Sequence, residues 1–186
     1  MHWEYAVPIA TIHVLTCLVF VPWCFSWSGV IIAGLGTVIF GTLGINLGYH
    51  RLLSHRSLSV PLWLERTLAT LAVCSLEDTP SRWVANHRLH HCHSDDEPDP
   101  HSPRDGVAWS HMGWLFRLVP HRKSINFLDK YARDILVDPY YRALEQHPMA
   151  VLWIYIAHAV VFGALGLLLG WWTSGDWEAC TQLAVS

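Results

Sequence analysis

Apolar positions along this chain are gathered in three long uncharged runs. Residues 6–27, 30–48 and 150–172 contain no Asp, Glu, Lys or Arg, and aliphatic and aromatic residues dominate each run. A helix of about 20 such residues crosses the hydrocarbon core of a bilayer, which is roughly 30 Å thick. Three runs of this length in one short chain are unusual for buried helices of a soluble protein. The pattern therefore predicts three transmembrane helices.

The first two runs are separated by only a few residues around Ser28 and Gly29, so they are expected to form a transmembrane hairpin. A cleaved signal peptide is not indicated, because the opening "MHWEY" lacks a basic region and no small-residue cleavage site follows. The predicted fold class is an all-α integral membrane protein. It consists of the hairpin, a third span and a helical region at 49–149, in a single, partial domain over 1–186.

The basic residues are confined to the middle of the chain. All 12 Lys and Arg lie between Arg51 and Arg142. Because basic residues near membrane ends favour the cytoplasmic side, the N-terminus and residues 49–149 are expected in the cytoplasm and the C-terminal tail outside. The 11 Trp fit membrane interfaces, and a net charge of −3 gives no indication of nucleic-acid binding.

Shorter patterns divide the polar middle into elements. Asp78, Thr79 and Pro80 form a helix-start signal, which predicts a helix from Pro80 to about His91. Several Pro and a Gly predict a loop at 95–106. The other expected elements are an interfacial helix at 60–76, an aromatic interfacial stretch at 109–116, and an amphipathic helix at 125–145 that breaks near Pro139.

Two clusters of histidine are the candidate chemistry. His87, His90 and His91, in "HRLHH", occupy positions i, i+3 and i+4, which share one face of a helix. His50 and His55, in "HRLLSH", are five positions apart and do not share a face of a regular α-helix. They would converge if the second span ended near His50 and the chain bent through "RLLS".

Clustered imidazoles indicate a metal site. Four of them could close a tetrahedral zinc site, whereas open coordination positions would suit iron and O₂ chemistry. His93 is six positions beyond His87 and is expected to point elsewhere. The acidic residues that follow, in "SDDEPD", have two interpretations: a solvated loop, or carboxylates that orient the ligating imidazoles.

The segments "GYHRLLSHRS" (48–57) and "NHRLHHCHSDDEPDPHSPRDGVAWSHMGWLF" (86–116) resemble the integral-membrane fatty acid desaturases, especially the acyl-CoA Δ9 (stearoyl-CoA) type. The resemblance implies two iron ions held by histidines on the cytoplasmic side, activation of O₂, and formation of a cis double bond in a saturated acyl chain. The residues that match iron ligands are His50, His55, His87, His90 and His91, while Trp83 and Arg104 match positions near the acyl tunnel and the substrate head group.

The resemblance also implies partners. The substrate would be a long-chain acyl-CoA or acyl-lipid. The electron donor would be a protein of ferredoxin, rubredoxin or cytochrome b5 type, and the setting would be a lipid bilayer, here a bacterial inner membrane. Ala85 and Asn86 stand where acyl-CoA members have Arg-Asp, so the carrier stays open between CoA, acyl-carrier protein and a phospholipid. The motif G-x-x-x-G at 44–48, and again at 166–170, indicates close helix packing or room for an acyl chain.

The chain departs from the family pattern in one respect. The family has a third box, H-x2-H-H, after a fourth span, and this sequence contains neither. Five matched histidines are too few for two irons. The expectation is therefore a C-terminally truncated desaturase that is inactive alone. The alternatives are a membrane di-iron hydroxylase and a non-enzymatic metal-binding membrane protein.

Overall fold

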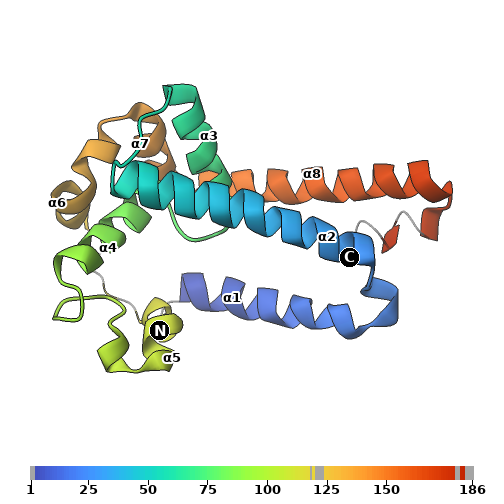
Figure 1. Ribbon diagram of the computed structural model, residues 1–186, viewed down its shortest axis with the longest axis horizontal. Coiled ribbons are helices and arrows are strands. Elements are labelled where there is room, and N and C mark those ends of the chain that lie inside the picture. The colour runs from blue at the N-terminus through green and yellow to red at the C-terminus, as the bar shows by residue number, and fades with distance from the viewer. Residues whose placement is uncertain (1–2, 118, 120–123, 179–180, 183–186) are drawn as a thin grey trace.

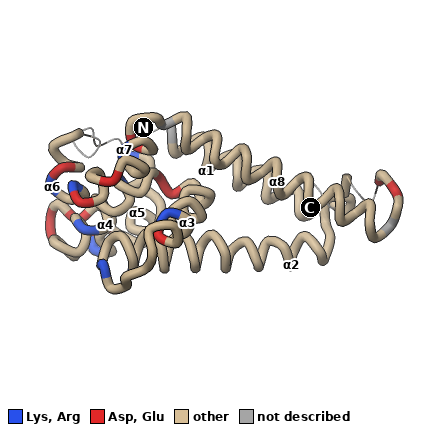
Figure 2. Tube along the Cα trace, turned by 90° about the horizontal axis from the view of Figure 1, so that it is seen from above, with Lys and Arg blue, Asp and Glu red and all other residues tan. Residues whose placement is uncertain are grey.

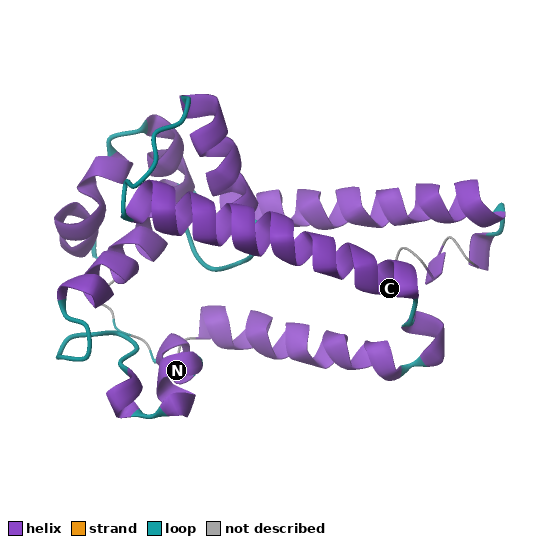
Figure 3. Ribbon diagram, in the orientation of Figure 1, coloured by secondary structure: helices purple, strands orange, loops and turns teal. Residues whose placement is uncertain are grey.

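The structure, a computed structural model, describes residues 3–117, 119, 124–178 and 181–182. All regular elements in these residues are helices, as Figure 3 shows, which confirms the prediction of an all-α fold. Three long helical segments extend side by side from one end of the molecule, and the shorter helices gather at that end (Figure 1). Most of the region predicted at 49–149 forms this group of shorter helices, but residues 49–54 still belong to the second long segment and 148–149 to the third. Residues 118 and 120–123 lie outside the described residues.

The first long segment is helix α1, Trp3–Thr16, followed by the 3-10 turns η1, Cys17–Phe20, and η2, Pro22–Cys24. The predicted helix over 6–27 is therefore too long at its C-terminal end. Pro22 has no backbone N–H to continue a helix and disfavours helical geometry in the residue before it. Val21 is accordingly extended, with φ −85° and ψ 117°.

The second long segment begins with helix α2, Trp27–Gly36, and continues without a break into a π-helix, η3, Thr37–Ser54. The Ser26 Oγ caps its start by accepting from the amide of Gly29 at 2.9 Å. The hairpin connection therefore precedes this cap and does not lie at Ser28 and Gly29. The helix also extends beyond the predicted 30–48, because π-type hydrogen bonds carry it to the end of the first histidine cluster.

The third long segment is helix α8, Pro148–Ser174, which contains the predicted span 150–172. Two helices of the described chain are long and apolar enough to cross a membrane: Trp27–Ser54 and Met149–Thr173. The apolar helical stretch Tyr5–Phe20 is shorter. Only 6% of the most apolar window of each long helix is buried, unlike the core helix of a soluble protein. Charged residues concentrate at the end with the short helices (Figure 2).

Four of the short helices pack around one apolar core at the base of η3: α3, Leu62–Val73; α4, Pro80–Cys92; α6, Ile125–Leu136; and α7, Pro139–Gln146. The short elements η4, Pro103–Asp105; α5, Val107–His111; and η5, Gly113–Phe116, contribute no residue to this core. Helix α4 begins where the Thr79–Pro80 signal predicted, with the Thr79 Oγ1 accepting from the amide of Arg82 at 3.4 Å. The break near Pro139 is confirmed, since Asp138 caps α7. The core joins Tyr49 and Leu53 of η3 to the buried faces of α3, α4, α6 and α7.

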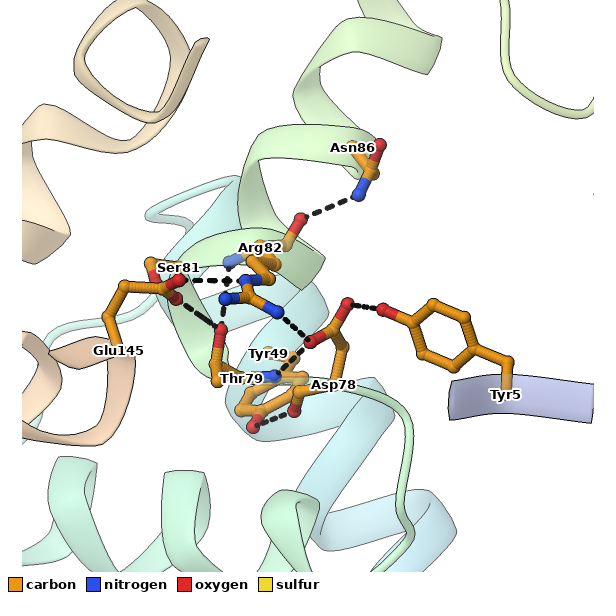
Figure 4. A network of polar contacts seen from close by, with 8 residues as sticks. All are labelled: Tyr5, Tyr49, Asp78, Thr79, Ser81, Arg82, Asn86 and Glu145. Atoms are coloured by element: carbon orange, nitrogen blue, oxygen red, sulfur yellow. Dashed lines mark hydrogen bonds and ion pairs between the residues drawn. The ribbon is translucent and has the colours of Figure 1, made fainter. Parts of the chain in front are cut away.

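A polar network fixes α1 and α7 to the start of α4 (Figure 4). The Tyr5 hydroxyl donates to the carboxylate of Asp78, and the hydroxyl of Thr79 donates to Glu145. Arg82 lies between the two carboxylates. Its Nε donates to Glu145 Oε1 at 2.7 Å, and its Nη1 is 3.8 Å from Asp78 Oδ1. Three segments far apart in the sequence are thus held together at the end of the molecule that carries the histidines.

Gly44 and Gly48 let α3 approach the π-helix closely. A Cβ at Gly44 would lie 2.6 Å from the backbone nitrogen of Ala72, and a Cβ at Gly48 would lie 3.0 Å from the carbonyl oxygen of Leu68. The motif at 44–48 therefore serves helix packing, as one of its two interpretations predicted.

We predict that Gly44→Ala lowers the free energy of unfolding by about 1–3 kcal/mol, because the added methyl meets the α3 backbone and the two helices must separate. Thermal unfolding in detergent micelles measures the change. Gly41→Ala is the matched control: it makes the same substitution in the same helix, where a Cβ has open space. Equal stability of the two variants would contradict the close approach.

Candidate metal centre

Four histidines from two helices bring their side chains to one point. His50 and His55 come from the end of η3, and His87 and His91 from α4. One ligand atom of each lies within 4.8 Å of the corresponding atom in every other member. The Nε2 of His55 is 3.1 Å from that of His50 and 3.2 Å from that of His87, and the Nε2 atoms of His87 and His91 are 3.1 Å apart. We refer to these four residues as the four-histidine group.

The π-helix explains how His50 and His55 meet. Residues five apart on an α-helix project about 140° from each other. In a π-helix the backbone hydrogen bond itself joins residues five apart, so they lie one turn above each other. The His55 amide donates to the His50 carbonyl at 3.0 Å, and the Ser54 hydroxyl donates to the Tyr49 carbonyl at 2.8 Å. The expected bend through "RLLS" is therefore wrong, because these residues continue the π-helix to Ser54.

Hydrogen bonding cannot account for all three of these short Nε2 contacts at once. Each Nε2 carries either one proton or one lone pair, yet the Nε2 atoms of His55 and His87 each face two others. Nitrogen ligands about 2.0–2.1 Å from one metal ion lie roughly 3 Å apart, which is the observed spacing. The donor set and its spacing therefore fit a metal ion.

His87 is held as a neutral ligand. Burial, and then the neighbouring imidazoles of His50, His91 and His55, lower its pKa to about 3. The ring of Trp83 stacks on it, with centroids 4.8 Å apart and planes 22° apart, and the Trp83 indole N–H donates to Glu77 at 3.2 Å. Burial and the nearby imidazoles also lower the pKa of His91. Both imidazoles are therefore uncharged near neutral pH, as metal binding requires.

His90 does not join the four-histidine group, although the spacing predicted one face for all three histidines of α4. Its ring centroid is 6.4 Å from that of His87, and its Nδ1 lies 2.9 Å and 3.0 Å from the two carboxylate oxygens of Asp99. The ring of His101 lies 4.2 Å away. His90, Asp99 and His101 form a second group of potential ligands. The carboxylate from the loop turns His90 away from its neighbours.

Asp99 is well placed to orient His90. Its side chain is fully buried, and its oxygens also accept from the amides of Asp95 and His101, both at 3.0 Å. Burial alone raises the pKa of Asp99, but the His101 amide, His90 and the Asp95 amide outweigh it, so the pKa lies below its usual value. An ionised Asp99 that accepts from Nδ1 leaves the Nε2 lone pair of His90 free for a metal. For Asp99, the interpretation as an orienting carboxylate is supported.

The sequence interpretation missed His101, which it left in a Pro-rich loop. The signal was present in the sequence "DPH". A turn that follows Asp99 brings the imidazole of His101, two residues later, back toward α4. The remaining acidic residues are less involved. Asp96 is 82% exposed and pairs at 3.6 Å with Arg104, which is 71% exposed. Arg104 also donates to the Asp95 carbonyl at 2.9 Å, so its structural contacts are within the loop.

We predict that Asp99→Asn weakens metal binding by about 10–100-fold, because an amide NH₂ would oppose one of the two backbone N–H donors and release His90. Competition with a chelator, with bound iron measured by mass spectrometry, gives the affinity. Asp96→Asn makes the same substitution on an exposed neighbour and should leave the affinity unchanged. If both variants bind metal like the unaltered protein, Asp99 does not orient a ligand.

Comparison with known proteins places this geometry in context. The family model described as fatty acid desaturase matches residues 22–183. The sn-1 stearoyl-lipid 9-desaturase of Anabaena variabilis is 37% identical over 177 residues, which cover 95% of this chain and 61% of the relative. The sn-2 palmitoyl-lipid 9-desaturase of Nostoc sp. is 36% identical over 92% of this chain and 58% of the relative.

A plant relative carries a different name. The acyl-CoA 5-desaturase AL21 of Anemone leveillei is 34% identical over 163 residues, which cover 87% of this chain and 49% of the relative. This chain therefore spans about half to three fifths of the length of these curated relatives.

Proposed function

Because this chain belongs to the fatty acid desaturase family, we propose that it takes part in inserting a cis double bond at position 9 of a saturated acyl chain in a membrane lipid. The observation that carries the proposal is the convergence of four Nε2 atoms from two helices, in a chain similar to acyl-lipid 9-desaturases. The two acyl-lipid relatives favour a glycerolipid over acyl-CoA as the carrier, and Ala85–Asn86 is consistent with this choice.

The metal that fits this proposal is iron. His50, His55, His87 and His91 would hold one ion, and His90 would serve a second through its free Nε2. When bound, iron supplies with O₂ the oxidising power that an unactivated methylene requires. Overall, the acyl chain loses two hydrogen atoms and O₂ becomes two water molecules. The additional two electrons and two protons reach the site from an external donor of ferredoxin, rubredoxin or cytochrome b5 type.

The protein's own side chains would prepare the site for this chemistry. Asp99 fixes the tautomer of His90, and burial keeps His87 neutral. Trp83 covers one face of His87 with an apolar ring, which excludes water and is consistent with its predicted place beside the acyl chain. Contact of Trp83 and Arg104 with substrate remains a prediction.

The proposed setting is a bilayer crossed by the long segments. Exposed apolar side chains, including Ile31 of α2 and Leu168 of α8, would face lipid. The basic residues that the structure describes lie at the end with the short helices, where α1 also begins, so this end would face the cytoplasm (Figures 1 and 2). In a bacterium this membrane would be the inner one. The α3 helix, with Trp63 69% exposed, would lie near the interface.

Expression of the full-length protein in a bacterium that lacks position-9 desaturation tests the function. Extracted lipids are hydrolysed selectively at sn-1 and sn-2, and the fatty acids are analysed by gas chromatography and mass spectrometry. We expect alkenes with the double bond at position 9 in glycerolipids, and no new acyl-CoA product. A hydroxy fatty acid would indicate a hydroxylase instead. An unchanged lipid profile, together with bound metal and no oxygen consumption, would indicate a non-enzymatic metal-binding protein.

A further inference from the structure

Arg88 uses every donor of its guanidinium to join three elements around the histidines. Its Nε donates to the Ser54 carbonyl at 3.2 Å, and its Nη2 to the Leu53 carbonyl at 2.8 Å. Its Nη1 donates to the Tyr131 carbonyl at 2.8 Å, and Nη1 and Nη2 reach the two oxygens of Asp134 at 2.7 Å and 3.0 Å. A guanidinium has five N–H donors, so all five are used here.

The position of Arg88 in the sequence makes this junction significant. It follows His87 directly on α4, and the two carbonyls it binds on η3 come immediately before His55. The last carbonyls of a helix lack partners within the helix, so a side chain that binds them stabilises its final turn. The side chain of Arg88 thus connects a ligand position of the second histidine cluster to one of the first.

Helix α6 supplies the counter-charge for this junction. Asp134 receives Arg88 in a bidentate pair and also pairs with Arg56, the residue after His55. The Arg88 and Asp134 side chains are 23% and 31% exposed, so solvent screens the pair only in part. Burial would raise the pKa of Asp134, but Arg88 and Arg56 lower it below its usual value. The carboxylate therefore stays ionised at neutral pH.

We infer that Arg88 is a positioning residue that sets the metal-site geometry by clamping the end of the π-helix, and so His55, to α4 and α6. A lysine cannot replace it, because a single ammonium has three donors and cannot form the planar fork that reaches Asp134 and two helix-end carbonyls together. The part of this inference that concerns metal rests on the proposed function, whereas the clamping of η3 does not depend on it.

The test compares Arg88→Lys with Arg66→Lys in the full-length protein. Arg66 also pairs with an aspartate between two helices: its Nη2 donates to both carboxylate oxygens of Asp138, at the start of α7, at 2.9 Å and 3.1 Å. We expect Arg88→Lys to weaken iron binding about tenfold or more, with Arg66→Lys unchanged. In the metal-free proteins, amide hydrogen exchange of residues 53–57 should rise about tenfold or more in Arg88→Lys alone, because the last turn of η3 loses its cap.

Iron binding and hydrogen exchange test the proposed function and the clamping of η3 separately. If the unaltered protein binds no iron, the proposed function fails, and hydrogen exchange still decides whether Arg88 clamps η3. Unchanged exchange and unchanged iron affinity in Arg88→Lys overturn the inference alone. If Arg88→Lys does not fold, Asp134→Asn replaces it: this variant keeps the guanidinium but loses its counter-charge. Its exchange at 53–57 should rise, and exchange equal to that of the unaltered protein overturns the clamp.

Discussion

Replacing His87 with alanine in the full-length protein is expected to abolish metal binding at the four-histidine group and, with it, desaturation. His87 lies in the middle of the group: its Nε2 faces those of His55 and His91, at 3.2 Å and 3.1 Å. It is also a ligand held neutral by burial, so no proton competes for it near neutral pH. Loss of an orienting partner weakens a metal site by about 10–100-fold, and loss of a ligand should exceed that range.

His93→Ala is the matched control for this prediction. His93 ends the same helix and is outside both groups of potential ligands that the described residues form. Iron content, chelator competition and the position-9 alkene fraction are measured for both variants, with circular dichroism to verify helical content. We expect iron and product to disappear in His87→Ala and to persist in His93→Ala. Iron content that is equal in both variants would remove His87 from the metal site.

The sequence predicts the long helices well because their signal is local. An uncharged run predicts α8 within two residues at each end and the second long segment except for its last turn, and the Thr79–Pro80 signal fixes the start of α4. The predicted helix ends are wrong where a single residue outweighs the average hydropathy of the run that contains it. Pro22 ends the first helical segment early, although the hydropathy around it continues unchanged.

The candidate site is only partly predictable, because its geometry depends on backbone type and on tertiary contacts. The spacing of His50 and His55 keeps the two side chains apart on an α-helix and brings them together on a π-helix. The sequence contains no separate signal that this segment is a π-helix. His90 has the spacing of a ligand facing the same way as His87, yet Asp99 turns it aside. In the sequence, Arg88 cannot be distinguished from an ordinary surface arginine within a histidine motif. Its role depends on contacts with α6, which lies about 40 residues further along the chain.

Replacing Arg82 with methionine is expected to be the most destabilising change outside the histidines. Its guanidinium lies between Glu145 and Asp78, whose side chains are only 11% and 16% exposed (Figure 4). Removing one partner of a buried pair costs about 3–5 kcal/mol, because the remaining charge stays buried without compensation. The remaining exposure, and the Thr79 and Ser81 hydroxyls that still donate to Glu145, favour the lower limit, about 3 kcal/mol.

The stability that Arg82→Met loses should be larger at higher pH. Burial raises the pKa of Asp78 above 3.8, and Tyr5 and Arg82 oppose that shift in part. Without Arg82 the pKa of Asp78 rises further, so the folded state binds a proton more tightly than the unfolded state. The variant should therefore lose stability as pH increases above about 4 and regain part of it on acidification toward that value. Unfolding in denaturant at pH 5 and pH 8 measures the difference.

Arg133→Met is the control, since it removes an arginine whose pair with Asp129 is exposed, at 78% and 62% of the two side chains. An exposed pair contributes little, so the control should change the free energy of unfolding by less than about 1 kcal/mol at either pH. A similar small change in Arg82→Met would mean that water reaches Glu145 and Asp78. The network would then not hold α1 and α7 to the start of α4, and the histidines of α4 would depend on the apolar core and Arg88 for their position.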